Sequence, residues 1–340
     1  MIKIYTDSSF IKPQFRKIIF PLLFDLCYIN NKNLLQLYQI VNSIEEADIV
    51  VVPIDIAYFF KNKNQQWLFD FIKKGNTASK PVWVYSAGDF GISLNADVSV
   101  FRFGGFRSKL NDNTFILPSF INDPLTYLKK EFIPIPKKTT PSIGFVGHAD
   151  ASLTKWCKEF LIYLRHNLKR MIKHSFDDYQ AFYPSSIKRH QFLKTLQNNN
   201  QIETDFIFRN KYRAGVKSEE EITNTTLEFF ENIYNNPYVF CLRGGGNFSV
   251  RLYETIAMGR IPVVIDTDFR LPLNTIIPWE KHCVIVSKKN FIKELIEFHE
   301  NISKSDFEKM QTNNRDLWLN YLNRESYFSI VYKIFKEIKV

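Results

Sequence analysis

Several features that would place the chain in a common class of protein are missing from its sequence. No uncharged apolar run approaches the ~18 residues that a membrane-spanning helix needs. The opening residues MIKIYTDSSF alternate like a strand and show no basic flank before a long apolar core, so we expect no signal peptide. The four cysteines form no CxxC pair, which is typical of reduced thiols in a cytosolic protein of this length.

Long basic runs are also missing, although the net charge is +10, from 45 Lys and Arg against 35 Asp and Glu. The pairs Lys129-Lys130 and Lys137-Lys138 are too short to form a nucleic-acid-binding arm. A positive surface attracts phosphorylated substrates, anionic membranes or nucleic acid, and it also serves solubility alone. We expect no nucleic acid partner and a cytoplasmic location, with peripheral contact at the anionic inner face of the membrane left open.

Strand-like and helix-like segments alternate along the chain, which predicts an α/β fold with mainly parallel sheets. Residues 131–142 contain three prolines and no periodic pattern, so we expect a linker there. The predicted domains are residues 1–135 and 141–320, with a terminal helix at 321–340 that packs back on the first domain. Expected strands are 2–6, 34–41, 45–55, 81–89, 98–105, 114–120, 142–148, 204–209, 237–243, 261–266 and 283–287. Expected helices are 15–28, 64–74, 152–174, 218–235, 249–258, 290–300 and 304–338.

Glycine is scarce, yet three of the twelve glycines, Gly244, Gly245 and Gly246, are consecutive. They join a predicted strand to a predicted helix that Ser249 can cap. Free N–H groups at a helix start favour an anion, and glycine lets the backbone approach a phosphate closely. Arg243 and Arg251 flank the loop with guanidinium groups suited to phosphate. Glu254, three residues after Arg251, adds an acceptor suited to sugar hydroxyls.

Other interpretations of this loop remain open on these residues alone. It can be a plain turn beside a solvated Arg–Glu pair. A Walker loop is excluded because no Gly-Lys-Ser/Thr follows the glycines. A dinucleotide site is a stronger alternative, since GGGNFS nearly fits GxGxxG and Asp266 follows Gly246 by twenty residues. Asp266 and Asp268 also form a DxD, which some sugar transferases use to bind a divalent ion.

The stretch from Phe240 to Ser287 resembles the core of the exostosin-like glycosyltransferases (GT47 type). The matching order is Arg-Gly, Ser-x-Arg-Leu-x-Glu, Gly-x-Ile-Pro-Val-Val, Asp, Leu-Pro and Trp. Weaker similarity extends to IYTDSSF, EADIVVVP and SIGFVGH. The family resemblance implies a GT-B fold, in which two Rossmann-like domains face each other across a cleft. It also implies inversion at the anomeric carbon, a nucleotide-sugar donor in the second domain, an acceptor in the first, and no required metal or other cofactor.

On this resemblance Arg243 and Arg251 contact the donor diphosphate beside the loop N–H groups, and Glu254 contacts the ribose. The full predicted donor site is Gly147, His148, Arg209, Arg213, Arg243, Gly244, Gly245, Gly246, Asn247, Ser249, Arg251 and Glu254.

The acceptor hydroxyl needs a general base on the face opposite the leaving group. Acids and histidines that follow strands are the candidates: Asp7, Asp55, Asp89 and His148. We select Asp89, which matches a family position, although the histidine that accompanies it in the family is replaced here by Phe90.

The sequence therefore predicts an inverting glycosyltransferase. We expect it to move a sugar from a nucleotide-sugar, with UDP favoured, to a hydroxyl of a glycan in bacterial surface polysaccharide or lipopolysaccharide synthesis. Two alternatives belong to other classes: an NAD-dependent oxidoreductase that uses the GGGNFS loop with Asp266, and a non-catalytic basic protein that binds nucleic acid or membrane. The oligomeric state is not predicted.

Overall fold

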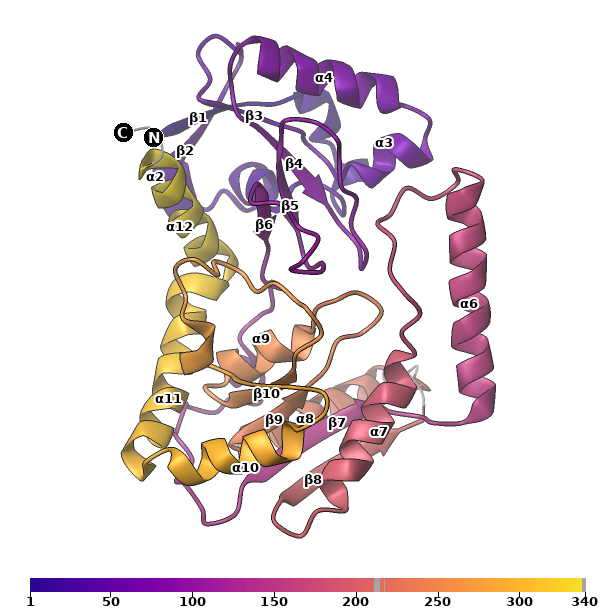
Figure 1. Cartoon of the computed structure of the whole chain (residues 1–340). Helices are drawn as coiled ribbons and strands as arrows, with labels where there is room; N and C mark the ends of the chain where they lie inside the picture. The colour runs from indigo at the N-terminus through magenta and orange to yellow at the C-terminus, as the bar shows by residue number, and fades with distance from the viewer. Residues whose placement is uncertain (211–214, 217, 338–340) are drawn as a thin grey trace.

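A computed structural model gives the fold of the chain and describes residues 1–210, 215–216 and 218–337. Two α/β domains stack one above the other in Figure 1, and each contains a parallel sheet. The prediction of an α/β fold with two parallel-sheet domains in a GT-B arrangement is confirmed. Among the described residues, no helix is both long and apolar enough to cross a membrane.

The N-terminal sheet has the order β2-β1-β3-β4-β5-β6 within the described residues, with every neighbouring pair parallel. Its strands are β1 (Ile2–Tyr5), β2 (Tyr38–Val41), β3 (Ile49–Val51), β4 (Val82–Ser86), β5 (Ser99–Arg102) and β6 (Thr114–Ile116). Its helices are α1 (Pro21–Phe24), α2 (Lys32–Leu37), α3 (Ala57–Lys61), α4 (Gln65–Thr77) and α5 (Pro124–Leu128).

The C-terminal sheet has the order β11-β10-β9-β7-β8 within the described residues, again all parallel. Its strands are β7 (Ser142–His148), β8 (Glu203–Arg209), β9 (Tyr238–Cys241), β10 (Ile261–Ile265) and β11 (Val284–Val286). The helices of this half are α6 (Leu153–Met171), α7 (Ser185–Gln197), α8 (Glu219–Asn235), α9 (Val250–Ala257), α10 (Phe291–Asn301), α11 (Lys304–Leu317) and α12 (Arg324–Glu337).

The strand order of the second sheet reverses between β7 and β9, because β8 lies outside β7 while β9, β10 and β11 extend the other way. In open parallel sheets such a switch point leaves a crevice at the carboxyl ends of the strands, where ligands bind. His148 ends β7 and the glycine loop follows β9. The fold therefore brings both predicted elements to the same crevice.

Three predicted elements are wrong in extent. The helix expected at 15–28 is broken, because Pro21 starts α1 and a π-helical turn, Asp25–Ile29, follows it. The first half of the strand expected at 34–41 is α2, which the Asn31 side chain caps by accepting the N–H groups of Asn33 and Leu34. The helix expected at 304–338 divides into α11, the π-helical turn Trp318–Leu322 and α12.

The last helix, α12, packs against the N-terminal sheet rather than the second domain's sheet. Phe328 and Phe335 contact the aromatic rings of Phe20 and Trp83, with centroid separations of 6.0 and 4.4 Å. The Tyr38 hydroxyl donates to the Phe328 carbonyl at 2.8 Å. One continuous apolar core therefore includes the first domain, α12 and the face of the second sheet that α9 covers.

Candidate active site

The glycine loop runs from β9 into α9 and touches the N-terminal domain along one side. A Cβ added to Gly246 would clash with the carbonyl oxygen of Asp89, and one on Gly245 would lie 3.2 Å from the Asp89 carboxylate. A Cβ on Gly244 would meet no described atom within 4 Å. Gly246 is therefore bare because the other domain approaches it, whereas Gly244 faces open space.

Beside Gly244 lies a polar pocket of about 660 Å³, which we call the basic hollow. It opens at the carboxyl ends of β7 and β8, at the switch point of the second sheet. Its lining residues are His148, Asp150, Thr154, Lys155, Lys158, Glu159, Ser185, Arg189, Asn210, Gly244 and Gly245.

The electrostatics of the basic hollow favour an anion. The cations Lys155, Lys158 and Arg189 outnumber Asp150 and Glu159 on its walls. The amino-terminal turns of both α6 and α7 reach it, and among the described residues no side chain caps α7. Exposed helix-start N–H groups add partial positive charge to that of the side chains.

Arg189 is the cation that the fold holds most firmly in this hollow. Its Nη1 donates to the His148 carbonyl at 2.6 Å, which fixes the guanidinium beside the end of β7. Its buried Nε has no partner among the described residues. Burial lowers the pKa of Arg189, and burial together with Lys155 and Arg189 lowers the pKa of His148. His148 is therefore neutral at pH 7, and the guanidinium provides the fixed charge.

Arg243 is buried at the start of the loop and already has partners. Its Nη2 donates to the Gln180 side chain at 2.6 Å and to the Gly245 carbonyl at 2.8 Å. The guanidinium also lies 4.6 Å from the centroid of the Tyr183 ring. Burial lowers its pKa to about 10, so it stays charged at neutral pH. In this arrangement Arg243 holds the loop and the segment between α6 and α7 together.

Arg251 and Glu254, on successive turns of α9, do not line the hollow as the described residues define it. The Arg251 guanidinium lies 4.0 Å from the centroid of the Phe145 ring and donates to the Val146 carbonyl at 2.6 Å. Burial lowers the pKa of Arg251 to about 10, while burial raises that of Glu254 to about 7, partly opposed by Arg251. A Cβ on Gly147 would lie 2.8 Å from Arg251 Nη2, so this glycine makes room for the guanidinium.

Asn247 and Ser249 were also predicted to bind the donor. The side chain of Asn247 is fully hydrogen-bonded within the protein, and that of Ser249 does not make the expected capping bond. The fully buried Asn247 donates to the carbonyls of Gly105, Thr267 and Asp268 and accepts from the Thr267 hydroxyl. Ser249 occupies the N-cap position of α9, but its hydroxyl makes no capping hydrogen bond within the described structure.

The two arginines predicted after β8 have different outcomes. Arg209 points toward α8, where it donates to the Thr225 carbonyl and pairs with Glu228. It does not line the basic hollow as the described residues define it. Arg213 lies outside the described residues.

On the other side of the glycine loop lies a second pocket of about 520 Å³, which we call the aromatic hollow. Both domains contribute to it. Its lining residues are Arg16, Lys17, Ile19, Pro21, Phe24, Tyr85, Gly88, Asp89, Phe103, Ser119, Phe120, Ile121, Phe248, Val250 and Arg324. Phe103 from the first domain stacks on Phe248 from the glycine loop, with centroids 6.1 Å apart.

Asp89 is the exposed carboxylate of this hollow, in the turn after β4. A buried acid supports that turn: Asp55 accepts the N–H groups of Ala57 and Ala87 at 3.1 and 3.0 Å. Burial raises the pKa of Asp55, partly opposed by these bonds. Asp7 accepts the Ser9 N–H and caps a short 3-10 helix, Ser8–Phe10. Of the predicted base candidates, Asp89 is the one that contacts the glycine loop.

The acids of the DxD face the first domain rather than the basic hollow. Asp266 lies 3.3 Å from Arg107, and Asp268 accepts from the Ser108 hydroxyl. In a dinucleotide site Asp266 would contact the ribose, but here its carboxylate faces Arg107. Within the described residues, no three His, Cys, Asp or Glu side chains are grouped as metal ligands would be.

An ion pair between the buried Arg102 and the half-buried Asp178 also joins the two domains beside the site. Arg102 on β5 pairs with Asp178 at 2.6 Å and donates to the Phe90 carbonyl. Asp178 in turn accepts from the Ser93 N–H and hydroxyl, each at 2.8 Å. The segment between α6 and α7 therefore fixes the turn that carries Asp89.

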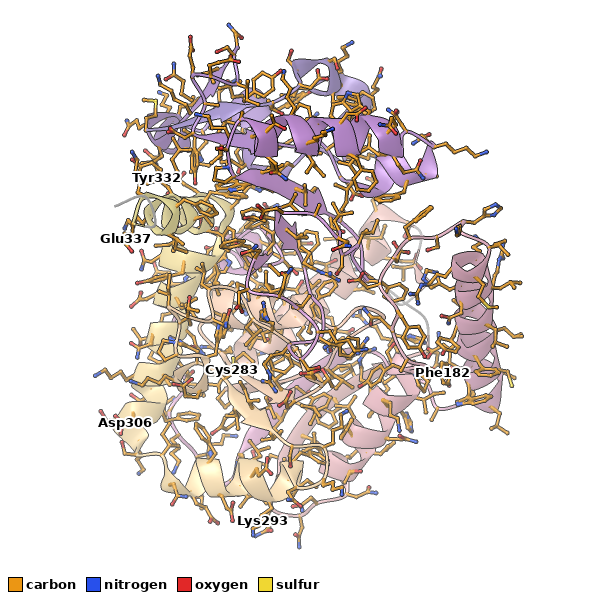
Figure 2. All side chains as sticks on the ribbon, turned by 45° about the horizontal axis from the view of Figure 1, so that its top comes forward. Phe182, Cys283, Lys293, Asp306, Tyr332 and Glu337 are labelled. Carbon is orange, nitrogen blue, oxygen red and sulfur yellow. The ribbon has the colours of Figure 1, made fainter. Side chains whose placement is uncertain are left out.

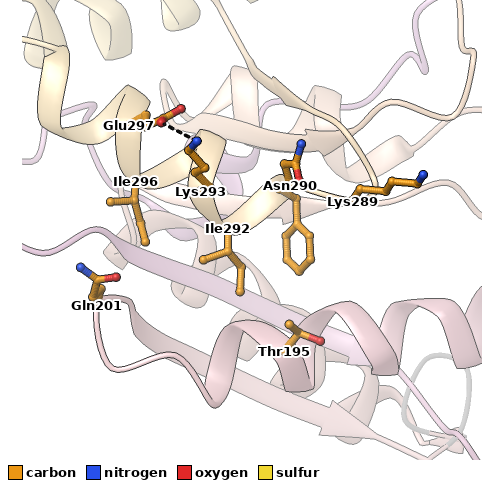
Figure 3. Close-up of a pocket in the computed structure, with 9 residues that line it drawn as sticks. Thr195, Gln201, Lys289, Asn290, Ile292, Lys293, Ile296 and Glu297 are labelled. Atoms are coloured by element: carbon orange, nitrogen blue, oxygen red, sulfur yellow. Dashed lines mark ion pairs between the residues drawn. The ribbon is translucent and has the colours of Figure 1, made fainter.

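Another hollow, of about 410 Å³, lies between α7 and α10 on the outside of the second domain (Figure 3). Its residues include Lys289, Lys293 and Glu297, and the latter two pair at 3.5 Å. No part of the glycine loop lines it. It is therefore a weaker candidate for a phosphate ligand than the basic hollow.

Sequence reasoning missed Lys155, Lys158 and Arg189. The helix that carries the two lysines was expected, but its first turn was not connected to the site. Helix α7 was not expected, although its buried Leu193 and Leu196 are three residues apart, as on one helix face. A helix prediction over 185–197, placed after β7 in the parallel sheet, would have brought Arg189 to the site.

Comparison with known proteins gives a match to a family model described as "Exostosin GT47 domain", over residues 26–302. The protein named "Probable beta-1,4-xylosyltransferase IRX10" from Arabidopsis thaliana is 34% identical over 68 residues, which are 20% of this chain and 16% of that protein. "Probable glucuronosyltransferase GUT1" from Oryza sativa subsp. japonica is 35% identical over 66 residues, 19% and 16% of the two chains. The matched segment spans about a sixth of these relatives.

Solved structures with a similar chain path include a glycosyltransferase from Rickettsia africae ESF-5, with a TM-score of 0.38, 12% identity, and coverage of 99% of this chain and 98% of that chain. WaaG, a glycosyltransferase involved in lipopolysaccharide biosynthesis, has a TM-score of 0.33, 8% identity and coverage of 98% and 99%. At these TM-scores the likeness says nothing about substrates.

Proposed function

The chain belongs to the exostosin GT47 family and is a glycosyltransferase, and from this premise we propose that the two hollows hold its two substrates. The basic hollow takes the diphosphate of a nucleotide-sugar, and the aromatic hollow takes a glycan acceptor. One observation carries the proposal: the glycine loop is a wall of both hollows, through Gly244 and Gly245 on one side and Phe248 on the other.

The donor assignment rests on charge and on the bare backbone. Lys155, Lys158 and Arg189 neutralise phosphate oxygens, and guanidinium suits bidentate contact. Gly244 leaves space where a phosphate approaches the main chain. Contact of Arg243 and Arg251 with the diphosphate remains our proposal as well, and it requires each guanidinium to exchange a carbonyl partner for a phosphate oxygen.

The acceptor assignment rests on the rings and on Asp89. Aromatic faces suit the apolar faces of sugar rings, and Phe24, Tyr85, Phe103, Phe120 and Phe248 provide them. The acceptor hydroxyl oxygen bonds to the anomeric carbon of the donor while the bond from that carbon to the diphosphate oxygen breaks. Its proton passes to the Asp89 carboxylate, and the diphosphate leaves with the electron pair. Attack opposite the leaving group inverts the anomeric centre.

Cationic side chains, rather than a required metal or cofactor, stabilise the leaving diphosphate in this proposal. We propose a UDP-linked sugar as donor and a glycan of bacterial surface polysaccharide or lipopolysaccharide as acceptor, in the cytoplasm. The relatives named above are plant xylosyl- and glucuronosyltransferases by their names, so pentose and uronic acid donors belong in the first screen.

A two-step experiment tests the proposal. Thermal shift with a panel of UDP-, GDP- and CMP-sugars, and with NAD, identifies the donor, and mass spectrometry then detects its hydrolysis or transfer. We expect stabilisation by one class of nucleotide-sugar that Arg189→Gln reduces. Stabilisation by NAD alone, or by the nucleotide-sugar equally in the wild type and Arg189→Gln, would contradict the site assignment.

A further inference from the structure

Helix α6 is amphipathic but leaves its apolar residues in solvent. In the described structure none of its nineteen residues is buried. Leu153, Leu161 and Met171 are 82%, 64% and 80% exposed. The amphipathic helix α4 behaves in the ordinary way and buries Leu68, Phe71 and Ile72 against its sheet. Contiguous exposed apolar surface of this kind marks a binding face.

The orientation of α6 is fixed by its other face. Trp156, Phe160 and Tyr163 surround Phe182 from the segment before α7, with ring centroids 5.3 to 5.7 Å from that of Phe182. Figure 2 shows Phe182 at this side of the helix, and Figure 1 shows α6 at the right edge of the molecule. The apolar residues on the adjacent face, about a quarter turn around the helix, are exposed and point away from the protein.

Those residues form one continuous line, which we call the α6 stripe. They follow one another at intervals of three or four residues and so share one helix face. The stripe consists of Leu153, Cys157, Leu161, Leu164, Leu168 and Met171, and all six are exposed.

Basic residues border the stripe. Lys158, Arg165 and Lys169 each follow a stripe residue by one position and so lie along one side of the stripe. All three are exposed, and no described residue forms an ion pair with them. The helix has five Lys and Arg but one acid, Glu159, which pairs with Lys155 at 3.4 Å. An apolar face beside a row of cations matches the acyl chains and headgroups of an anionic bilayer.

We propose that α6 docks in the plane of an anionic lipid surface, with the stripe inserted and Lys158, Arg165 and Lys169 at the headgroups. The intervals of three and four residues would also suit pairing with a second copy of α6. Charge disfavours that occupant, because Lys158 and Arg165 beside each seam would meet cations and no acid of the partner helix.

This docking does not require either hollow to be occupied, although Lys158 belongs both to the border of the stripe and to the wall of the basic hollow. It does, however, place the basic hollow near the lipid, because Thr154, Lys155 and Lys158 in the first turns of α6 line that hollow. The site then opens close to the membrane surface.

Binding to vesicles tests the proposal directly. Cys157 is the exposed cysteine of the stripe, whereas Cys241 and Cys283 are buried. In a Cys27→Ser background, a polarity-sensitive fluorophore on Cys157 should shift to the blue with vesicles of phosphatidylcholine and phosphatidylglycerol (3:1), and not with phosphatidylcholine alone. Co-sedimentation of the unlabelled wild type should show the same preference and should weaken with salt.

Two pairs of variants separate the stripe from its border. Leu161→Gln with Leu168→Gln should abolish co-sedimentation, whereas Ile133→Gln with Leu319→Gln, also at exposed apolar positions, should leave it unchanged. Arg165→Gln with Lys169→Gln should weaken binding about tenfold to thirtyfold. The same exchange at the exposed Lys304 and Lys309 of α11 should change it less than threefold. Unchanged thermal melting shows that each variant is folded.

Three results would overturn the proposal. The wild type could fail to bind the anionic vesicles at low salt, or the Leu161→Gln, Leu168→Gln variant could bind them as the wild type does. In sedimentation equilibrium, a wild-type dimer that this variant converts to a monomer would instead assign the stripe to a second copy of the chain.

Discussion

The two hollows that flank the glycine loop are close together but differ in their chemistry. The basic hollow is lined by polar and charged residues from the second domain, at the carboxyl ends of β7 and β8. The aromatic hollow is lined largely by rings and aliphatic side chains from both domains, with Asp89 and the cations Arg16, Lys17 and Arg324 also on its wall. The basic hollow suits a diphosphate whose negative charge increases as it leaves, and the aromatic hollow suits an uncharged sugar ring that must be oriented.

This difference also divides the work of a transferase between the hollows. Fixed cations stabilise a leaving diphosphate but would not activate a hydroxyl, which needs a base such as Asp89. The glycine loop separates Arg189 of the basic hollow from Asp89, while the close approach of Asp89 to Gly245 keeps both within one reaction volume. Variants on each side should therefore damage different steps.

The largest effect is expected from Asp89→Asn. It removes the proposed base but keeps the shape of the turn, so transfer should fall by roughly 10²- to 10⁴-fold while donor-induced stabilisation persists. Single-turnover assays with the donor measure the first quantity and thermal shift measures the second. Full turnover in this variant would assign the proton transfer to another group.

The next largest effect is expected from Arg189→Gln in the basic hollow. Loss of a charged hydrogen bond to phosphate costs about 1.5 to 3 kcal/mol, or roughly 10- to 150-fold in kcat/KM. Donor-induced stabilisation should fall with it. Lys188→Gln is a matched control, because Lys188 is the exposed neighbour on the same helix and does not line the hollow. Equal losses in both variants would make the effect one of helix α7 rather than of the site.

A smaller effect, on stability, is expected at Glu254 on α9. Its pKa is raised to about 7, so the folded state favours the protonated carboxyl. The stabilisation is complete below about pH 4.5 and is lost as the pH rises through about 7, which amounts to about 1 to 3 kcal/mol. Glu254→Gln cannot titrate, so the wild type should lose stability relative to this variant between pH 5 and pH 8 in urea denaturation. A constant difference would mean that Glu254 is ionised throughout.

The smallest effect is expected from Phe103→Leu in the aromatic hollow. It removes one ring face but keeps apolar volume, so the acceptor KM should rise about threefold to tenfold, from ~1 kcal/mol of ring contact. The donor KM and donor-induced stabilisation should not change. A change in the donor KM instead would show that the two hollows are not separate subsites.

The sequence predicted the parallel α/β architecture and the position of the glycine loop well, because buried strands and glycine turns leave local patterns. It could not show why each glycine is needed. Gly246 must lack a side chain because the Asp89 backbone lies against it. Asp89 is more than 150 residues away along the chain, and no local sequence pattern predicts such a contact. Arg251 and Asn247 look like ligand-binding residues in the sequence, yet their present partners are main-chain carbonyls in this structure.

The same limit explains the elements that were wrong or missed. The break between α11 and α12 occurs at a π-helical turn, Trp318–Leu322, which contains no proline that would predict a break. Helix α7 follows Pro184 and lies in an aromatic and polar stretch with few strong helix signals. Arg189 is therefore recognised as a site residue only from the structure, in which α7 lies beside the end of β7.

The position of α12 has a consequence for how the protein is made. Tyr327, Phe328 and Val331 are fully buried in the core that includes the first domain's sheet. The ribosome delivers these residues after the second domain's strands, so the domain that is synthesised first cannot complete its packing until the second domain has also been synthesised. Domains usually fold in order of synthesis, starting from the N-terminus. In this protein the second domain can finish its own sheet before α12 is available to the first.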